Sequence, residues 1–395
     1  MPEQIALRSR NLVVLTQSQP GLLIPVIALS LFAVASGYLM SLIPLMLSQY
    51  GIEAKYASWL ASAFYAGLLV GAGLIEPFVA RLGHKNAFVL FLILLAATIV
   101  ILPSMPIEWV WMTARFIAGI AVAGVFVVVE SWLLIGDAES RPKRLGLYMG
   151  ALYGGSSLGQ LGIGFIGIEG LLPYYMIIGL IMIAIACLLF GKGAQPQVQH
   201  HNVLNLKQIL KLNKASIMGC VVSGLLLGAV YGLMPLELKH RNINTTQIGS
   251  LMALIVLGGM AVQPLVSYLS KHLGKTLLMA LFCILGVFAI GLTTLSDNTA
   301  VLATALVLLG MAAFALYPIA ISLGCDTLDE SYIVSATQVM LFSYSIGSVC
   351  GPVLANTLMH TAEGLMSYLF AILLATAIYM LLASMRQHRP MVAGE

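Results

Sequence analysis

The sequence predicts an all-α integral membrane protein with twelve transmembrane helices, and two observations support this. Of its 395 residues, 60% are hydrophobic and 9% are charged, whereas soluble domains carry roughly 25% charged residues. A helix needs about 20 apolar residues to cross the hydrocarbon core of a bilayer. Polar residues divide the chain into twelve runs of suitable length, which we expect near residues 21–48, 56–80, 86–103, 108–135, 145–167, 171–190, 215–238, 245–269, 275–294, 299–324, 331–358 and 362–384.

Basic residues are distributed unevenly over the connections between these runs. If the N-terminus is cytoplasmic, fifteen Lys and Arg residues lie inside and three, Lys55, Lys239 and Arg241, lie outside. The positive-inside rule therefore predicts that both termini are cytoplasmic. The net charge of +4 reflects this topology, so we expect a multi-pass protein of the cell membrane, surrounded by lipid, with no nucleic-acid partner.

The longest connection, residues 191–214, divides the chain into two halves, 1–190 and 215–395. Its second part is expected to form an amphipathic helix on the cytoplasmic face of the membrane. The adjacent His200 and His201 have no Cys or carboxylate neighbours, so we expect them to be solvated rather than bound to a metal. One face of the helix would be apolar and the other basic, with Val203, Leu206, Ile209 and Leu210 opposite Lys207, Lys211 and Lys214.

The two halves match each other weakly at a nearly constant offset, as related repeats would. Residues 113–131 align with residues 304–322 at an offset of 191, and "ARLGHK" at 80–85 aligns with "KHLGKT" at 271–276 at the same offset. "SLGQ" at 157–160 aligns with "VCGP" at 349–352 at an offset of 192. Two six-helix repeats are therefore expected.

Glycines recur at every fourth position in two of the predicted spans. This spacing lets helix backbones approach closely in membranes. We therefore expect two lines of close helix packing, at Gly146, Gly150 and Gly154 in the fifth span and at Gly224, Gly228 and Gly232 in the seventh.

This organisation and three local motifs resemble the major facilitator superfamily (MFS) over essentially the whole chain. "ARLGHK" is similar to the superfamily's Asp-Arg-x-Gly-Arg-Lys signature, with Arg81, Gly83 and Lys85 retained and Ala80 in place of the aspartate. The fourth span keeps an Arg-x-x-x-Gly pattern from Arg115 to Gly119. "SIGSVCGP" in the eleventh span has the Gly-x-x-x-Gly-Pro form that antiporter members carry in the fifth, where Gln160 stands in place of the proline.

A closer resemblance is to the YcaD-type subgroup of this superfamily. "RFIAGIAVAGVFVVVESWLL", "RLGLYMGALY" and "SLGQL" are the segments that carry it. The resemblance implies the MFS fold, with twelve helices in two pseudo-symmetric six-helix bundles. It also implies a monomeric secondary transporter without a cofactor, rather than an enzyme, in the bacterial inner membrane.

Two ionisable residues lie within the fourth span, on one stripe of the helix with Gly119, Val122, Ala123 and Phe126. Arg115 and Glu130 are separated by about 22 Å along the helix axis, so they do not pair with each other. Ionisable groups at membrane depth are costly and are candidates for a functional role. Arg115 is expected to bind an anionic group or to tune a carboxylate; the alternative is a hydrogen bond to backbone carbonyls at a helix break.

Glu130 has two interpretations. In the first, Glu130, Glu76 and Arg81 form a clamp that closes the cytoplasmic side, within a gate that also includes Gly83 and Lys85. In the second, Glu130 binds the proton that drives transport, because burial favours the protonated carboxyl. The sequence leaves both open.

The remaining polar candidates are tyrosines and glutamines within the predicted spans. Such side chains hydrogen-bond a ligand while their apolar parts pack against it. They predict a mildly polar, aromatic cavity suited to a small amphipathic or neutral organic solute. The candidates are Tyr38, Tyr65, Tyr153 and Gln160 in the first half and Tyr231, Gln263, Tyr317, Gln338 and Tyr344 in the second.

We therefore predict a secondary active transporter of a small organic solute, coupled to protons. The 20 methionines suggest a copper importer as an alternative, but the Met-x-x-x-Met spacing that soft-metal ligation on a helix requires does not occur. A second alternative is a membrane sensor or scaffold without transport activity, because fold alone does not establish function. Five unpaired cysteines indicate neither disulfides nor a zinc site.

Overall fold

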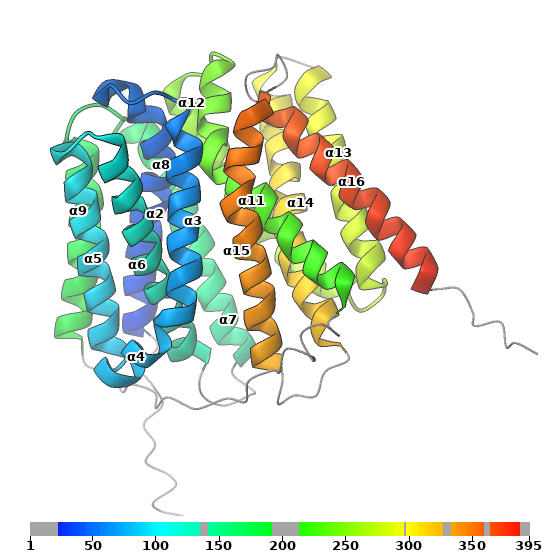
Figure 1. Ribbon diagram of the computed structural model, residues 1–395, viewed down its shortest axis with the longest axis horizontal. Helices are drawn as coiled ribbons and strands as arrows, with labels where there is room; N and C mark the ends of the chain where they lie inside the picture. The colour runs from blue at the N-terminus through cyan, green and yellow to red at the C-terminus, as the bar shows by residue number, and fades with distance from the viewer. Residues whose placement is uncertain are drawn as a thin grey trace, which may run out of the picture.

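A computed structural model describes residues 23–134, 141–191, 213–295, 298–326, 333–358 and 364–387, and helices make up almost all of them (Figure 1). The first half comprises α2 (Leu23–Met46), η1 (Leu47–Tyr50), α3 (Tyr56–Leu74), α4 (Glu76–Leu82), α5 (His84–Ser104), α6 (Glu108–Leu134), α7 (Arg141–Met149), η3 (Gly150–Gly154), α8 (Gly155–Phe165) and α9 (Leu172–Phe190). The second half comprises α11 (Lys214–His240), α12 (Thr245–Leu269), α13 (Lys275–Leu295), α14 (Thr299–Cys325), α15 (Ile333–Leu358) and α16 (Gly364–Gln387).

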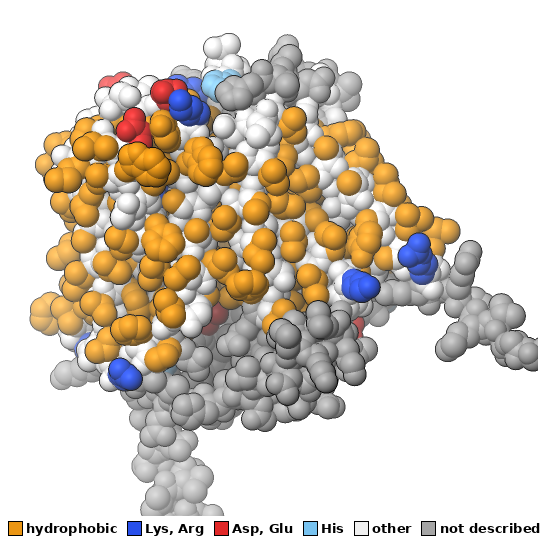
Figure 2. Space-filling model, in the orientation of Figure 1, with side chains coloured by type: hydrophobic (Ala, Val, Ile, Leu, Met, Phe, Trp, Pro, Cys, Tyr) orange, Lys and Arg blue, Asp and Glu red, His pale blue; other side chains and the backbone are white. Residues whose placement is uncertain are grey.

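Eleven helices in the described ranges are long and apolar enough to cross a membrane. The predicted fifth span, 145–167, is present but is not one continuous helix. It is divided into α7, the π-helical η3 and α8, where a glycine-rich sequence makes irregular helix geometry inexpensive. Figure 2 shows apolar side chains over most of the visible face, with described charged residues near its upper and lower margins, as expected for a protein surrounded by lipid.

The helices of the two halves pack in the same pattern. In the first half α2 lies against α8 and α9, α6 lies against α3 and α5, and α5 contacts α9. The equivalent pairs in the second half are α11 with α15 and α16, α14 with α12 and α13, and α13 with α16. Figure 1 shows the first half on the left and most of the second on the right. The chain therefore folds as two pseudo-symmetric bundles.

Individual glycine contacts repeat at the offset found in the sequence. Gly67 packs on the carbonyl of Phe116, and Gly258, 191 positions later, packs on the carbonyl of Val307. Gly119 and Gly310 form the same kind of contact in the opposite direction, on the carbonyls of Phe64 and Ile255. Each glycine lies where a Cβ would overlap the partner backbone, so these helices approach as closely as glycine permits.

Leu23, the first residue of α2, and Gln387, the last residue of α16, lie at one end of the molecule (Figure 1). The two bundles meet mainly at the opposite end. Near this end Ser62 Oγ of α3 donates a hydrogen bond of 2.7 Å to the carbonyl of Val349 in α15. Gly249 at the start of α12 packs on the carbonyl of Gln160 in α8. Both contacts join one bundle to the other.

One of the two predicted glycine packing lines is correct and the other is wrong. Gly224 and Gly228 of α11 pack against the backbone of α15, and Gly232 packs against Ala61 of the other bundle. In contrast, a Cβ at Gly146, Gly150 or Gly154 would meet no atom within 4 Å. The spacing alone could not distinguish glycines at a helix contact from glycines that border open space.

Some predictions fall outside the described residues. These include the amphipathic helix of the linker, with His200 and His201, because residues 192–212 are not described. The five cysteines are all described, and all are free thiols as expected.

Candidate functional site

Arg115 lies in α6, where Gly119 brings this helix into contact with α3. The residue is only 7% exposed, and its guanidinium carbon lies 4.3 Å from the centre of the Phe64 ring. Its Nε has no hydrogen-bond partner among the described residues. Stacking on an aromatic face compensates part of the cost of burying the cation, and the N–H of Nε remains available to a ligand.

A small pocket surrounds Arg115 at the interface between the bundles. Its space is about 20 Å³, which is room for about one water molecule. Tyr65 and Tyr231 line it from opposite bundles, together with Met40 and Pro44 of α2. In this conformation the pocket is therefore almost closed around the guanidinium.

Five of the predicted tyrosines form one group, and three aromatic contacts involve four of them. The rings of Tyr153 and Tyr231 both meet Phe314 of α14 edge to face, at centroid distances of 5.5 Å and 6.0 Å. Tyr317 and Tyr344 pack against each other at 4.9 Å. Tyr65 completes the group, since it is close enough to Tyr344 and Arg115 to interact with both electrostatically.

Glu130 lies near the far end of α6 from Arg115, with its side chain exposed. Tyr148 of α7 donates a hydrogen bond of 2.9 Å to its Oε1. Tyr317 of α14 is within electrostatic range of this carboxylate. The carboxylate is therefore accessible at the end of α6 that lies far from Arg115.

The predicted gate residues lie around α4 and the start of α5. Gly83 has φ +76°, a conformation that favours glycine. Lys85 Nζ donates to the carbonyls of Leu189 and Gly191 at the end of α9, at 3.0 Å and 3.4 Å, where a cation is favourable. Arg81 is exposed, and the side chain of Glu76 lies outside the described part. No ion pair joins Arg81 to Glu130 in the described residues, and the clamp stays a prediction.

Three other candidates make hydrogen bonds within the protein. Tyr38 donates to the carbonyl of Gly167 at 2.5 Å, Gln160 Oε1 accepts from Ser41 at 2.5 Å, and Gln263 Nε2 donates to the carbonyl of Gly259 in its own helix at 3.1 Å. These contacts support packing between or within helices. The side chain of Gln338 lies outside the described part.

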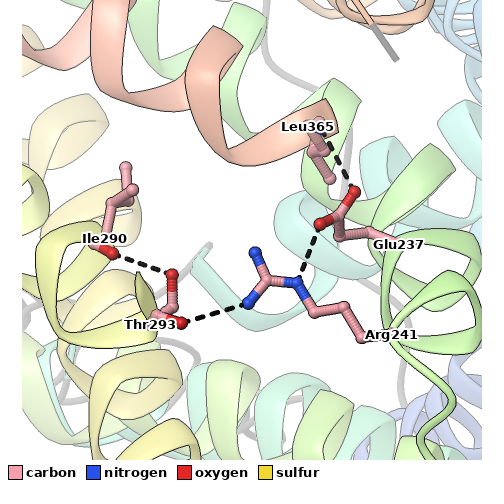
Figure 3. Close-up of polar contacts among 5 residues, drawn as sticks. All are labelled: Glu237, Arg241, Ile290, Thr293 and Leu365. Carbon is pink, nitrogen blue, oxygen red and sulfur yellow. Dashed lines mark hydrogen bonds and ion pairs between the residues drawn. The ribbon is translucent and has the colours of Figure 1, made fainter. Parts of the chain in front are cut away.

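The second half contains a buried charged residue, Glu237, that is not among the candidates predicted from the sequence. Glu237 is 6% exposed and accepts from Arg241 Nε at 2.9 Å and from the amide of Leu365 at 3.2 Å (Figure 3). Arg241 also donates to the carbonyl of Thr293 at 3.3 Å. This cluster joins α11, α13 and α16 and includes none of the tyrosines described above. The (i, i+4) spacing of Glu237 and Arg241 was the available signal.

His84 is a second correction. The predicted third span begins at residue 86, which leaves His84 in the preceding connection, but it is the first residue of α5 and is 1% exposed. Its ring lies 6.0 Å from that of Trp132 near the end of α6, because α5 packs against α6. Phe64, Phe314 and Tyr148 were also missed, since isolated aromatic residues in apolar helices look like ordinary core residues in the sequence.

Comparison with known proteins identifies the family. Residues 26–352 match the model of the Major Facilitator Superfamily. The chain is 33% identical over 382 residues to the uncharacterized MFS-type transporter Ent638_1421 of Enterobacter sp. (strain 638), covering 96% of this chain and 99% of that protein. It is 35% identical over 349 residues to the uncharacterized MFS-type transporter YcaD of Salmonella dublin, covering 87% and 90%.

Solved structures support the same fold. The nucleoside transporter NupG, in a point-mutant form, superposes with a TM-score of 0.76 at 12% identity, covering 93% of this chain and 99% of that one. The human organic anion transporter MFSD10 gives a TM-score of 0.66 at 16% identity, covering 91% and 98%. From the family match, the two bacterial relatives and this fold, the chain belongs to the major facilitator superfamily and is a YcaD-like multi-pass membrane transporter.

Proposed function

We propose that the protein is a secondary active transporter that moves a small organic solute with one anionic group by alternating access, coupled to protons. The observation that carries this proposal is Arg115: a buried guanidinium at the bundle interface, stacked on Phe64 and without a partner for Nε among the described residues. A cation is retained in a membrane span at considerable cost. Binding an anion there would offset that cost.

The surroundings of Arg115 favour a singly charged, partly aromatic or aliphatic solute. Among the described residues that line the pocket, Arg115 is the one charged side chain. Its planar fork matches a carboxylate, with two parallel hydrogen bonds. The tyrosine group beside it offers aromatic faces and hydroxyl groups for the rest of the solute. A multiply charged solute would find no second buried cation among the described residues of this pocket.

The bundle contacts support an inward-open conformation under the proposed topology. If both termini are cytoplasmic, the contacts Ser62–Val349 and Gly249–Gln160 close the outer end. The small size of the Arg115 pocket agrees with a closed outer side. Glu130 is exposed at the opposite end. Rocking one bundle against the other would open the Arg115 side and cover Glu130.

Glu130 is the proposed site of proton coupling, and the clamp with Arg81 and Glu76 remains its alternative role. Its carboxylate accepts a hydrogen bond from Tyr148 of its own bundle and is within electrostatic range of Tyr317 in the other. A carboxyl group that is wet in one conformation and covered in the other would bind its proton more tightly when covered. We further expect a monomer in a bacterial inner membrane.

A thermal-shift screen followed by transport assays tests the Arg115 proposal. Purified protein would be screened against monocarboxylates, dicarboxylates and uncharged analogues of the same size, since a ligand that binds the folded state raises its melting temperature. We expect monocarboxylates to give the largest shift. Arg115→Ala should weaken binding by about ten- to hundredfold, equivalent to about 1.5–3 kcal/mol for a charged hydrogen bond, and Arg115→Lys should weaken it less.

Arg241→Lys is the matched control, because Arg241 belongs to the Glu237 cluster and not to the pocket. It should lower the melting temperature and leave ligand binding and transport per folded molecule unchanged. Uptake into proteoliposomes would be normalised to folded protein for every variant. Near-normal transport by Arg115→Ala would remove this residue from the substrate site and contradict the proposal.

A further inference from the structure

A second cavity lies on the other side of the bundle interface. It has a volume of about 710 Å³ and is lined by α2, by η3 and α8 of the fifth span, and by α12. We call it the lateral groove. It shares no lining residue with the Arg115 pocket among the described residues, so its occupant is a separate question.

The lining of the lateral groove includes exposed apolar side chains. Leu158 and Leu257 line it and are exposed, at 62% and 37%, and these exposed apolar side chains belong to spans that the bilayer surrounds. Glycines of η3 form its floor, since Gly150 and Gly154 border it and a Cβ at either would meet no atom within 4 Å. The groove therefore offers an apolar molecule both contact surface and open space.

One polar group in the groove has no partner among the described residues. Ser157 lines it and is 4% exposed, and its hydroxyl oxygen makes no hydrogen bond to any of them. The serines at its margin differ, because Ser30 donates to the carbonyl of Val26 and Ser250 to that of Thr246. A buried hydroxyl without a partner is costly, so a ligand that supplies one oxygen at this point would be favoured.

The lining also restricts the charge of the occupant. The described residues that form the groove are apolar apart from the three serines, and none is charged. An ionised group would remain unpaired at membrane depth. From these contacts we infer that the lateral groove binds an uncharged lipophilic molecule taken up from the bilayer, whose single hydrogen-bonding oxygen meets Ser157.

Photolabelling in liposomes tests this inference with the full-length protein. The probes are a diazirine derivative of 1-octanol and the matching diazirine derivative of octane, which lacks the hydroxyl. Labelled positions would be mapped by mass spectrometry. We expect the alcohol to label α8 and α12 more strongly than the hydrocarbon does. Ser157→Ala should lower labelling by the alcohol by about three- to tenfold, as for one hydrogen bond, and leave labelling by the hydrocarbon unchanged.

Gly154→Leu should abolish labelling of the groove by both probes, because the added side chain occupies its open space. Gly179→Leu is the matched control: Gly179 is also a helical glycine with open space around it, but it lies in α9 and not in the groove. It should label like the wild type. Melting temperatures would confirm that both variants fold.

Wild-type labelling of Gly154→Leu would overturn the groove as the binding site. Equal labelling by the two probes, with no effect of Ser157→Ala, would overturn the hydrogen bond to Ser157. Arg115→Ala should label normally, so this result does not depend on the proposed transport function.

Discussion

The fifth and eleventh spans occupy equivalent positions in the two bundles, yet the fifth is divided by η3 whereas the eleventh, α15, is one continuous helix. Their contacts with the neighbouring helix are the same. Gly155 and Gly159 pack on the backbone of α2, and Gly347 and Gly351, 192 positions later, pack on the backbone of α11.

The opposite faces of these two spans differ. Gly150 and Gly154 border the lateral groove, whereas the equivalent residues of α15 are Phe342 and Ile346, which are large and exposed. Glycine thus has two roles in one span: it permits close packing on one face and leaves space on the other. Pseudo-symmetry is kept where the helices of each bundle pack together and lost at the lateral groove.

Gly347→Leu should have the largest effect on this comparison. Its Cβ would overlap the carbonyl of Val221, and overpacking costs about 1–3 kcal/mol even where side chains can move. A rigid backbone cannot yield in this way, so we expect little folded protein by size-exclusion chromatography and no resolved melting transition. Gly154→Leu should fold normally. Equal stability of the two variants would contradict the distinction between packed and open glycines.

A second pair of equivalent positions differs in charge. In the second bundle, Glu237 accepts a hydrogen bond from the amide of Leu365. The equivalent residues of the first bundle, 191 positions earlier, are Met46 and Tyr174, and there the sulfur of Met46 accepts from the hydroxyl of Tyr174 at 3.1 Å. Glu237→Met should lower the free energy of unfolding by about 3 kcal/mol, because Arg241 then loses its carboxylate. Met46→Leu should cost less than about 1.5 kcal/mol. Thermal unfolding in detergent would compare them, and similar losses would show that the ion pair adds no stability.

Gln160 and Pro352 form a third pair of equivalent positions. Gln160 is fully buried and accepts from Ser41, whereas Pro352 lies beside Gly232, the equivalent of Ser41. Ser41→Ala should lower the free energy of unfolding by about 1–3 kcal/mol, because a buried amide oxygen loses its donor. Ser30→Ala is the control, since Ser30 donates only within its own helix among the described residues. An equal loss in both would show that the contact between α2 and α8 does not depend on this hydrogen bond.

The two bundles also differ at the end where Glu130 and Tyr148 lie. In the second bundle Ile321 is equivalent to Glu130, and Val339 or Met340 is equivalent to Tyr148, so these positions are apolar. If Glu130 also forms the clamp when this end closes, Glu130→Gln should favour the open state, with a shift of about fivefold or about 1 kcal/mol. Spin labels at the ends of α4 and α14 would report the distance distribution. Distances like those of the wild type would leave proton binding as the role of Glu130.

The outline of the candidate site could be predicted, but its composition could not. Arg115 and Glu130 were found because an ionisable residue is conspicuous in an apolar span, and five of the tyrosines lie together as expected of a shared cavity. Phe64 and Phe314, which hold Arg115 and two of those tyrosines, have no such signature. Tyr38 and Gln160 have the same residue types as the cavity candidates, but their partners are Gly167 and Ser41.

Composition, apolar run length and basic-residue distribution determined the twelve-span membrane fold, because the bilayer imposes the same length and charge limits on every span. The repeat offset also lies in the sequence, and the glycine contacts follow it closely. Only the tertiary structure decided which glycines meet a backbone and which border open space, because spacing defines a helix face but not what lies against it. The same holds for the surroundings of Glu130, Glu237 and Ser157, since each depends on helices that are distant in the chain and adjacent only after packing.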